Sequence, residues 1–529
     1  MLIDARSLTD RTHLKTDLCI IGAGAAGITL ARALRHLPVQ ICVLESGGLG
    51  YEPTTQALYE GENVGVGYWP LSAARVRFFG GTTNHWGGVC LPLEVDDFEA
   101  REWVADSGWP FTREHLLPWY RRAQSLFDIG PYAYGAEEWL PGHERPLPVD
   151  AARVLTEVVQ VSAARFGTRY RNELRAADNL RIFLHANVLE IETDAVGTQV
   201  SRVRAACLGG PHFTVSARIY VMALGGIENA RLLLLSQGAN PSGLGNGHDL
   251  VGRYFSDHPY LSDVAQLIVP DVGVSTAAYE GERQKGNMRF LCHLKLTPEV
   301  RRKERLLSTR LVVQPLHWSR HSPGVRRLSR LREAILVGGT AVDRVARGLI
   351  RAMQDLDEVA IAAYHTTHGG RRFRIGAWTE TVPNRASRVR LGEQLDAFGQ
   401  RRVVLDWRIG QQESRSIART LEIIGAEIGR SGLGRLRLNF DPDTPVEWGT
   451  EMTTAPHPGL HHMGTTRMHP DPSRGVVDEH CRVHGIANLF IAGSSVFPTY
   501  GHANPTLTIG ALALRLADHL KSRLEAQIA

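Results

Sequence analysis

The sequence predicts an α/β fold in two parts: a mostly parallel sheet visited by three separated segments of the chain, and a second part of antiparallel sheet with helices. Three observations lead to this prediction. Residues 16–45 give a short apolar run, a glycine-rich turn, a helical pattern and a second apolar run. Residues 218–236 and 488–520 repeat the order of strand, glycine and helix, whereas residues 260–451 alternate more as antiparallel strands do. A chain of 529 residues also exceeds what one hydrophobic core usually serves.

The first of these segments has the pattern of a dinucleotide-binding turn. The apolar run Leu18–Ile21 ends in "GAGAAG", after which apolar residues recur at helical spacing. Gly22 permits a tight turn, Gly24 lets backbone N–H groups approach a pyrophosphate, and Gly27 allows close packing of helix on strand. Glu45 ends the second strand, where an acidic side chain can accept hydrogen bonds from a ribose. Strand, turn, helix, strand and acid together predict a Rossmann-like domain, but they leave open which dinucleotide it binds.

Composition excludes several other classes of protein. Apolar residues make up 43% of the chain and charged residues 22%, and no apolar run approaches the roughly eighteen residues of a membrane span. The residues before the first strand contain no apolar export signal. The six cysteines stand singly without a CxxC pair, which favours reduced thiols and a cytoplasmic location. A net charge of +5 is small for this length and does not indicate a nucleic-acid partner.

Two later segments could carry chemistry. The loop "RFFGGTTNHWGGVC" at 77–90 has the glycines to pass close to a flat or charged ligand, although an ordinary connection would also use them. The segments "PHPGLHHMGTTRM" at 456–468 and "YGHANP" at 500–505 gather four histidines. Their spacing lacks the helical repeat and the carboxylate of a metal site, so we predict no metal. An imidazole beside a redox cofactor could instead take the hydroxyl proton of an alcohol as hydride leaves its carbon, with Asn504 holding the same oxygen.

Residues 301–351 form a strongly basic segment. It holds thirteen Lys or Arg against three acidic residues, a net of +10. Such a run is usually a solvated surface, and the alternative is docking on an anionic membrane surface or an acidic redox partner.

The chain resembles the glucose-methanol-choline (GMC) family of FAD oxidoreductases, in the branch of pyranose oxidase and bacterial sugar dehydrogenases. The likeness runs through "GAGAAG", "GGTTNHWGG", "ALGGIENARLLLLS", "VGRYFSDHP", "HHMGTTRM", "VVDEHCRVHGIANLFIAGSSVFPT" and "GHANPTLT", in that order. Where many members have an aspartate after the last strand this chain has Gly493, which weakens any inference to choline or aryl-alcohol substrates. The resemblance implies a GMC oxidoreductase fold with FAD as the dinucleotide.

The same resemblance implies roles for individual residues. His461, not His462, would be the catalytic base, and Asn504, not His502, would be the second catalytic residue. His85 matches the histidine that carries covalent flavin in pyranose oxidase, but a His85 that only hydrogen-bonds the cofactor would give the same sequence. The expected cofactor-binding residues are Gly22, Gly24, Ala26, Gly27, Glu45, Gly81, Thr82, Asn84, His85, Val188, Gly225, Gly493, Ser494, Asn504, Pro505 and Thr506.

The resemblance also implies an activity and a domain plan. We expect oxidation of an alcohol group, most simply on a sugar, glycoside or polyol, with oxygen, a quinone or a protein as electron acceptor. Two alternatives stay open: a lyase of the same architecture in which FAD is structural, and a flavoprotein subunit that passes electrons to a membrane or protein partner. A flavin-binding scaffold without activity ranks last. Residues 1–95, 180–258 and 455–529 are expected to form the FAD domain, and residues 96–179 and 259–454 the substrate domain.

Overall fold

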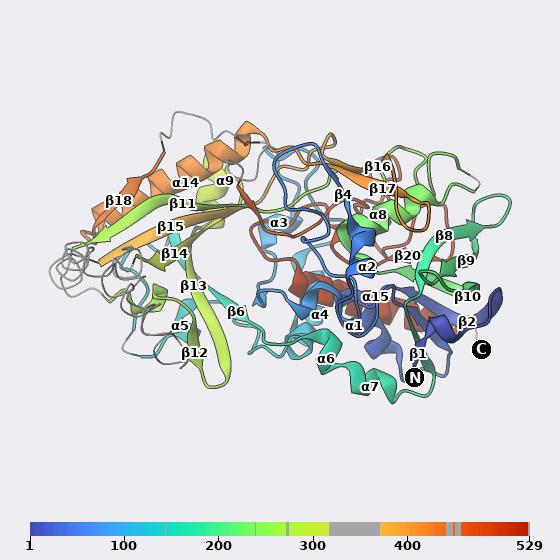
Figure 1. The fold of residues 1–529 in the computed structure, drawn as a ribbon. Helices are drawn as coiled ribbons and strands as arrows, with labels where there is room; N and C mark the ends of the chain where they lie inside the picture. Colours follow the sequence, from blue (N-terminus) through green and yellow to red (C-terminus); the bar gives the residue numbers. More distant parts are fainter. Residues whose placement is uncertain are drawn as a thin grey trace, which may run out of the picture.

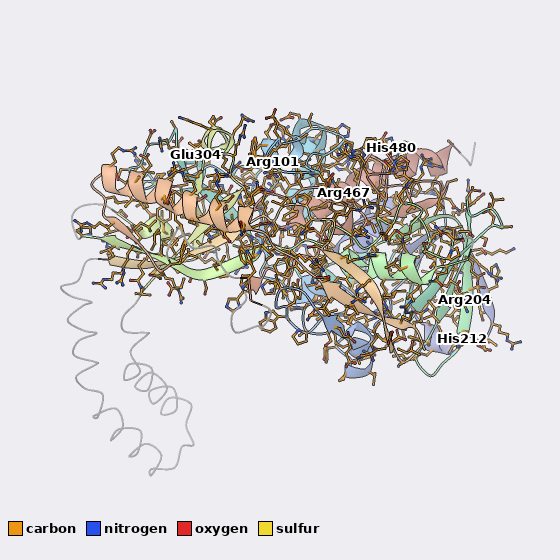
Figure 2. All side chains as sticks on the ribbon, turned by 90° about the horizontal axis from the view of Figure 1, so that it is seen from above. Arg101, Arg204, His212, Glu304, Arg467 and His480 are labelled. Atoms are coloured by element: carbon orange, nitrogen blue, oxygen red, sulfur yellow. The ribbon has the colours of Figure 1, made fainter. Side chains whose placement is uncertain are left out.

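Two sheets lie at opposite ends of the protein. The computed structural model describes residues 1–142, 144–238, 240–270, 275–316, 371–440, 448–449 and 456–526. A mostly parallel sheet occupies the right of Figure 1 and an antiparallel sheet the left. The view from above in Figure 2 keeps Arg204 and His212 at one end and Glu304 in the other half. The predicted α/β class is confirmed. Among the helices described, none has the length and apolarity to cross a membrane.

Eight described strands make up the parallel sheet. In spatial order they are β1 (Leu2–Asp4), β7 (Leu180–Leu184), β3 (Ile41–Leu44), β2 (Thr12–Ile21), β10 (His212–Met222), β9 (Val200–Ala206) and β8 (Asn187–Thr193), with β20 (Leu489–Ile491) also paired to β10. Strands β9 and β8 run antiparallel at one edge, and the pairings from β1 to β10 are parallel. Because β10 and β20 come from distant parts of the chain, the sheet is discontinuous in sequence.

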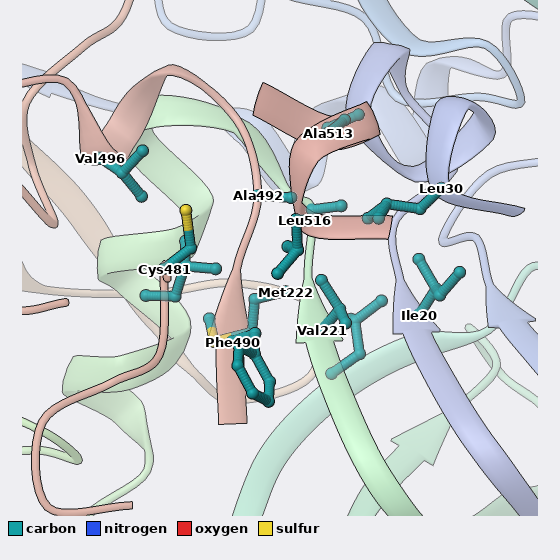
Figure 3. Close-up of a cluster of buried hydrophobic side chains, with 14 of the residues drawn as sticks. Ile20, Leu30, Val221, Met222, Cys481, Phe490, Ala492, Val496, Ala513 and Leu516 are labelled. Carbon is teal, nitrogen blue, oxygen red and sulfur yellow. The ribbon is translucent and has the colours of Figure 1, made fainter. Parts of the chain in front are cut away.

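The three predicted returns to this sheet are confirmed. Strand β2 leads into α1 (Ala25–Leu34) and then β3. Strand β10 pairs with β2 and is followed by α8 (Gly225–Leu235), and β20 pairs with β10 ahead of α15 (Thr506–Glu525). Figure 3 shows the result: Ile20, Val221 and Phe490 stand on neighbouring strands, with Leu30 of α1 and Leu516 of α15 packed over them. One apolar core therefore joins segments that are far apart in sequence.

The apolar residues alternate from 180 to 191, which suggests one strand, but the structure has two strands there, β7 and β8. The chain breaks between β7 and β8 at His185, whose φ is +60°. The His185 amide donates to the Gly47 carbonyl at 3.0 Å, and the next amide, of Ala186, donates to Glu45 at 2.8 Å. The chain therefore turns against the end of β3 instead of continuing as one strand.

The second sheet is antiparallel, as the alternation between residues 260 and 451 predicts. In spatial order its strands are β18 (Arg435–Leu438), β11 (Pro259–Val269), β15 (Arg371–Thr379), β14 (Thr309–Pro315), β13 (Met288–Leu296), β6 (Val154–Val161) and β5 (Val89–Cys90), with β12 (Arg283–Lys285) on β13 and β19 (His457–Pro458) on β11.

Alternate residues give this sheet one apolar and one polar face. Leu311 of β14 and Ala377 of β15 join a second core with Ile424 of α14 (Gln411–Arg430), which covers the sheet. Because side chains alternate along a strand, the neighbouring Arg310 and Trp378 point to the opposite face. That opposite face is turned toward the functional site described below.

The alternating residues 388–391 and 403–409, with "EQLDAFGQR" between them, indicate a hairpin, and the structure contains it. Strands β16 (Arg388–Leu395) and β17 (Arg401–Asp406) pair across a turn in which Gly399 has φ +71°. The hairpin extends β4 (Gly61–Asn63) into a separate small sheet, and β16 contacts α8. The pair therefore lies on the parallel-sheet half of the molecule (Figure 1).

Short helices connect these layers. Helix α4 (Arg113–Leu126) begins at the predicted N-cap Thr112, whose hydroxyl accepts from the His115 amide at 3.4 Å, and it packs on α15. The others are α2 (Pro53–Gln56), α3 (Val95–Phe98), α5 (Ala136–Trp139), α6 (Phe166–Arg169), α7 (Arg171–Arg175) and α9 (Pro298–Glu304), with 3₁₀ turns η1 (Ala5–Ser7), η2 (Ala57–Tyr59), η3 (Gly81–Asn84), η4 (Ala277–Tyr279) and η5 (Ser494–Val496).

Candidate active site

A cavity of about 350 Å³ opens at the carboxyl ends of the parallel strands. Turns that follow β2, β3, β10 and β20 supply one wall, and residues 459–462 and 504–506 supply another. The predicted site residues that line it are Gly22, Gly24, Ala26, Glu45, Gly81, Thr82, His85, Gly225, His461, Gly493, Ser494, Asn504, Pro505 and Thr506. Segments separated by several hundred residues thus meet at one site.

The turn at the start of α1 is open to this cavity. Gly24 is the N-cap of α1 and no side chain caps the helix. A Cβ added at Gly24 would meet no atom within 4 Å, so this position borders open space. The free amide groups and the dipole of a helix N-terminus favour a negatively charged group such as a pyrophosphate.

Glu45 braces the same turn from the end of β3. Its Oε2 accepts from the Ala23 amide at 2.9 Å and its Oε1 accepts from the Gly47 amide at 2.9 Å. Burial raises the pKa of this carboxyl, and the two amide donors and Arg77 oppose that rise. The side chain therefore fixes the backbone around the cavity and also lines it.

Three predicted cofactor-binding residues lie outside this wall. Gly27 is a packing residue, because an added Cβ would lie 1.9 Å from the Gly22 carbonyl oxygen. Asn84 braces its own loop by donating from Nδ2 to the Phe79 carbonyl at 2.9 Å. Val188 lines a smaller cavity of about 40 Å³ that shares Ser46, Tyr59 and Leu224 with the larger one.

His85 stands exposed at the cavity. Burial of part of the ring, with a smaller contribution from Arg165, lowers the pKa of His85, so the imidazole is unprotonated near neutral pH. The neighbouring Trp86 is fixed by a hydrogen bond from its Nε1 to the Ala164 carbonyl at 2.9 Å.

A chain of hydrogen bonds holds His461. Its amide donates to Asp257 Oδ1 at 2.9 Å, and its Nδ1 lies 3.0 Å from Nδ1 of His258. His258 Nε2 lies 2.9 Å from the Gly501 carbonyl, which can only accept, so this nitrogen carries the proton. A neutral His258 then accepts at Nδ1, and His461 must donate from its own Nδ1. This leaves Nε2 of His461 as an acceptor, and Asn504 Nδ2 donates to it at 3.2 Å.

Burial keeps these imidazoles neutral. Desolvation lowers the pKa of His461 to about 3, and the charge of Arg310 acts in the same direction. Burial likewise holds the pKa of His258 well below its usual value, with His461 adding to the shift. Burial raises the pKa of Asp257 to about 7, against the donors that favour its charged form, of which Tyr68 is the strongest. At neutral pH, His461 is therefore an unprotonated base.

Arg310 fixes the orientation of Asn504. Its Nη2 donates to Asn504 Oδ1 at 2.7 Å. Since Oδ1 is occupied in this way, the amide nitrogen of Asn504 is the atom that faces His461 Nε2. A lone pair and an N–H donor thus converge on one point of the cavity wall.

His462 and His502, which we do not expect to be catalytic, have different surroundings from His461 and Asn504. His462 also lines the cavity, but its ring packs near Tyr68 and Phe255, and its carbonyl accepts from Ser494 Oγ at 2.6 Å. A Cβ added at Gly226 would lie 2.2 Å from that carbonyl oxygen, so the start of α8 packs directly on this loop.

His502 is fully buried away from the cavity wall. Its Nδ1 lies 2.6 Å from Ser308 Oγ and its Nε2 lies 2.8 Å from Glu157 Oε2. Both ring nitrogens therefore have partners in the antiparallel half of the molecule.

Asp257, His258 and His461 could by distance alone hold a metal ion, since their ligand atoms lie within 4.8 Å of one another. Asp257, however, accepts from Tyr68 and from two backbone amides. The two histidine nitrogens face each other at hydrogen-bond distance. We interpret the group as a hydrogen-bonded network, because a cation would have to displace the shared proton.

Sequence reasoning missed the residues that support His461 and Asn504. Asp257 and His258 lie within "VGRYFSDHP", which carried the family resemblance without a role for either residue. Arg310 lies in the basic segment, where a single buried arginine has no local signature. Residues 317–351 of that segment lie outside the described residues.

The chain is similar to several known oxidoreductases. The family model described as GMC oxidoreductase matches residues 383–513. The 6'''-hydroxyparomomycin C oxidase of Streptomyces lividus is 27% identical, over 96% of this chain and 92% of its own. The fructose dehydrogenase large subunit of Gluconobacter japonicus is 23% identical, over 97% and 99%. The solved structure of formate oxidase from Aspergillus oryzae, a protein that undergoes FAD modification, has the same fold, with a TM-score of 0.54, 15% identity and coverage of 98% of this chain and 99% of its own.

Fold, site and comparisons define an FAD-dependent oxidoreductase that acts on CH–OH groups of alcohol- or sugar-type substrates. The chain matches the GMC oxidoreductase family over residues 383–513 and is similar over nearly its whole length to an oxidase and a dehydrogenase subunit. The cavity fits this cofactor, because an uncapped helix N-terminus, an open Gly24 and a buried carboxylate line the same space.

Proposed function

We propose that the protein oxidises an alcohol group on a sugar, glycoside or polyol to the carbonyl, with His461 as general base and Asn504 as the residue that orients the hydroxyl. One observation carries the proposal. A neutral imidazole nitrogen and an amide donor, 3.2 Å apart, face each other at the wall of the FAD cavity. An alcohol oxygen that replaces this direct contact and bridges both groups from the cavity would give its proton to His461 Nε2 and accept a hydrogen bond from Asn504 Nδ2.

The roles of the protein groups follow from this arrangement. Bound FAD supplies the acceptor for the hydride that leaves the alcohol carbon. His461 Nε2 takes the hydroxyl proton, and its Nδ1–H remains hydrogen-bonded to His258, which stabilises the imidazolium. Asn504 Nδ2 donates to the alcohol oxygen, and Arg310 keeps the amide in that orientation. His258 and Arg310 are positioning residues here.

The proposal has four further parts. All sixteen predicted residues would contribute to cofactor binding, and Gly27, Asn84 and Val188 would do so without lining the large cavity. Residues 1–95, 180–258 and 455–529 would form the FAD domain, and residues 96–179 and 259–454 the substrate domain. His85 would hold the flavin covalently, supported by its unprotonated ring at the cavity. The described cysteines are all free and buried, which supports a reducing, cytoplasmic compartment.

The electron acceptor is a separate question. The likeness to an oxidase supports oxygen, and the likeness to a dehydrogenase large subunit supports a protein partner or a quinone. The basic segment 301–351 is our candidate for contact with such a partner or an anionic membrane surface. In its described part Arg301 and Arg310 are buried, whereas Arg302, Lys303 and Arg305 are exposed.

The test is anaerobic reduction of the bound flavin by a panel of alcohols and glycosides, followed as loss of the yellow colour. His461→Ala should retain FAD and slow the reduction about a hundredfold to ten-thousandfold, the usual contribution of a positioned general base. His462→Ala is the matched control and should cost far less. If no alcohol reduces the flavin, the result favours the lyase alternative. If His462→Ala slows flavin reduction more than His461→Ala does, the assignment of His461 is wrong.

A further inference from the structure

Arg310 is a buried cation next to the proposed reaction point. It stands on β14 directly opposite Trp378 of β15 and Lys295 of β13. The residue is only 3% exposed, and its guanidinium carbon lies 5.1 Å from the centre of the Trp378 ring. Through Asn504, which lines the FAD cavity, Arg310 is connected to the site where the alcohol would react.

Most of the hydrogen-bonding capacity of Arg310 is unused. Its Nη2 binds Asn504, whereas its buried Nε and Nη1 have no acceptor among the residues the structure describes. Within the same residues, no carboxylate lies within 4 Å of the guanidinium. Desolvation lowers the pKa of Arg310 to about 10, which still leaves it charged at neutral pH. A buried charge without a partner is costly, and proteins retain one mainly where a ligand supplies the partner.

The acidic groups closest to Arg310 are already engaged. Glu157 attracts Arg310, but its two oxygens are bound by Lys295 and His502. Lys295 also donates to Glu94 at 2.5 Å, and Glu94 in turn pairs with Arg301 at 2.6 Å. These contacts form a closed network beside Arg310, so no carboxylate in it is free to pair with the guanidinium.

Neighbouring side chains add unpaired polar nitrogens on the same face of the sheet. Nε1 of Trp378 is buried without a partner in the described structure, and so is Nδ1 of His293, two residues from Lys295 on β13. Trp378 also contacts the base, since its ring centre lies 5.4 Å from that of His461. A cation and an indole N–H are suited to a negatively charged oxygen, and neither suits another cation.

We propose that Arg310 binds the carboxylate of an anionic alcohol, so that the substrates of this enzyme are hydroxy acids of the sugar-acid or polyol-acid type. The inference rests on the proposed function and narrows it. A single guanidinium matches one negative charge, which favours a carboxylate over a phosphate dianion. Because Arg310 and His461 both contact Asn504, the carboxylate would lie within a few bonds of the carbon that is oxidised.

A purely structural role for Arg310, that of holding Asn504, makes different predictions. Gln at 310 can still donate to Asn504 Oδ1 but has no charge, whereas Lys keeps the charge and loses the planar donor. Under our proposal, Arg310→Gln should lower kcat/KM for a sugar acid such as gluconate at least about a hundredfold more than for its neutral amide, mainly through KM, because loss of the contact with Asn504 affects both substrates and loss of the charge affects only the acid. Arg310→Lys should recover part of the loss for the acid alone. Arg437→Gln, on the exposed edge strand β18 of the same sheet, is the control and should change neither substrate.

Binding is measured separately from turnover. Acetate and malonate should raise the melting temperature of the wild-type holoenzyme and perturb its flavin spectrum, with chloride at equal ionic strength as reference, and Arg310→Gln should abolish both effects. Inorganic phosphate should be clearly weaker, and a stronger response to phosphate would overturn the choice of carboxylate. The proposal is overturned if wild-type enzyme uses acid and amide equally well, a result available even if the variants do not fold. Flavin that no alcohol reduces would instead contradict the proposed function.

Discussion

The two sheets build their parts of the site in different ways. On the parallel sheet, backbone makes the site: glycines and helix starts at strand ends leave amide groups and open space, and a single carboxylate, Glu45, braces them. On the antiparallel sheet, side chains make it: Arg310 and Trp378 reach inward from opposed positions on neighbouring strands. His461 lies between the two sheets and is hydrogen-bonded to His258, just before β11, and to Asn504, just before α15.

This difference decides what each half tolerates. A site made of backbone depends on local conformation, so one added methyl group can remove it. A site made of inward-pointing side chains on a regular sheet can exchange them while the strands stay paired. We therefore expect single substitutions on the parallel sheet to abolish cofactor binding, and single substitutions on the antiparallel sheet to reduce activity gradually.

The largest expected effect is at the glycines of the first turn. In Gly24→Val the new side chain would enter the open cavity, so the protein should fold but bind no flavin. In Gly27→Val it would meet the Gly22 carbonyl, already 1.9 Å from an added Cβ, so the fold itself should be lost. Flavin absorbance and the melting temperature of the soluble fraction separate the two outcomes. Equal flavin content in wild type and Gly24→Val would remove the nucleotide assignment.

A smaller effect is expected at His258, where the two halves meet. His258→Phe keeps a ring between Trp378 and Tyr500 but cannot accept from His461 Nδ1. Loss of such an orienting partner should slow flavin reduction about tenfold to a hundredfold. His258→Gln, which retains an acceptor, should recover part of the rate. Equal rates in His258→Phe and wild type would mean that the tautomer of His461 is not set by this contact.

The pH dependence tests the same contact. A lowered pKa means that His461 loses its function as a base only when the pH falls through the lowered value, here about 3, and not through 6.5. Asp257, whose pKa burial raises to about 7, titrates between pH 7 and 5, so the measurement is made on Asp257→Asn as well as on the wild type. In Asp257→Asn the rate of flavin reduction by a neutral alcohol should stay level over this range, and an acid limb centred near pH 6.5 in stopped-flow measurements of that variant would contradict the buried, neutral base.

The smallest effect on the fold is expected at His85. Acid-precipitated wild-type protein should keep its yellow colour and yield a flavin-bearing peptide that contains His85. His85→Asn should still bind FAD, because the rest of the wall is unchanged, but should release it to the supernatant on precipitation. If the wild type also releases all its flavin, the covalent linkage is wrong and FAD binding stands.

The sequence indicated the cofactor half in detail because its signals are local. The order of strand, glycine turn and helix recurs three times, and each copy lies in the parallel sheet. The split at His185 escaped prediction, since the turn depends on Gly47 from another strand end. Arg310, Trp378 and Glu157 are separated by up to 221 positions and meet only through strand pairing, so no window of sequence contains their relation. His461 and Asn504 were found through resemblance, and their roles stay predictions.

The contact between Gly226 and the His462 carbonyl has a practical consequence for redesign. It ties the loop that carries the proton acceptor to the start of α8, and Ser494 ties the same loop to the turn after β20. A mutant library confined to the inward positions of β13, β14 and β15, with Arg310 and Trp378 kept because they contact Asn504 and His461, would leave this loop untouched. Directed evolution toward new substrates could then change the antiparallel sheet, while the loop that carries His461 stays packed against the parallel-sheet half.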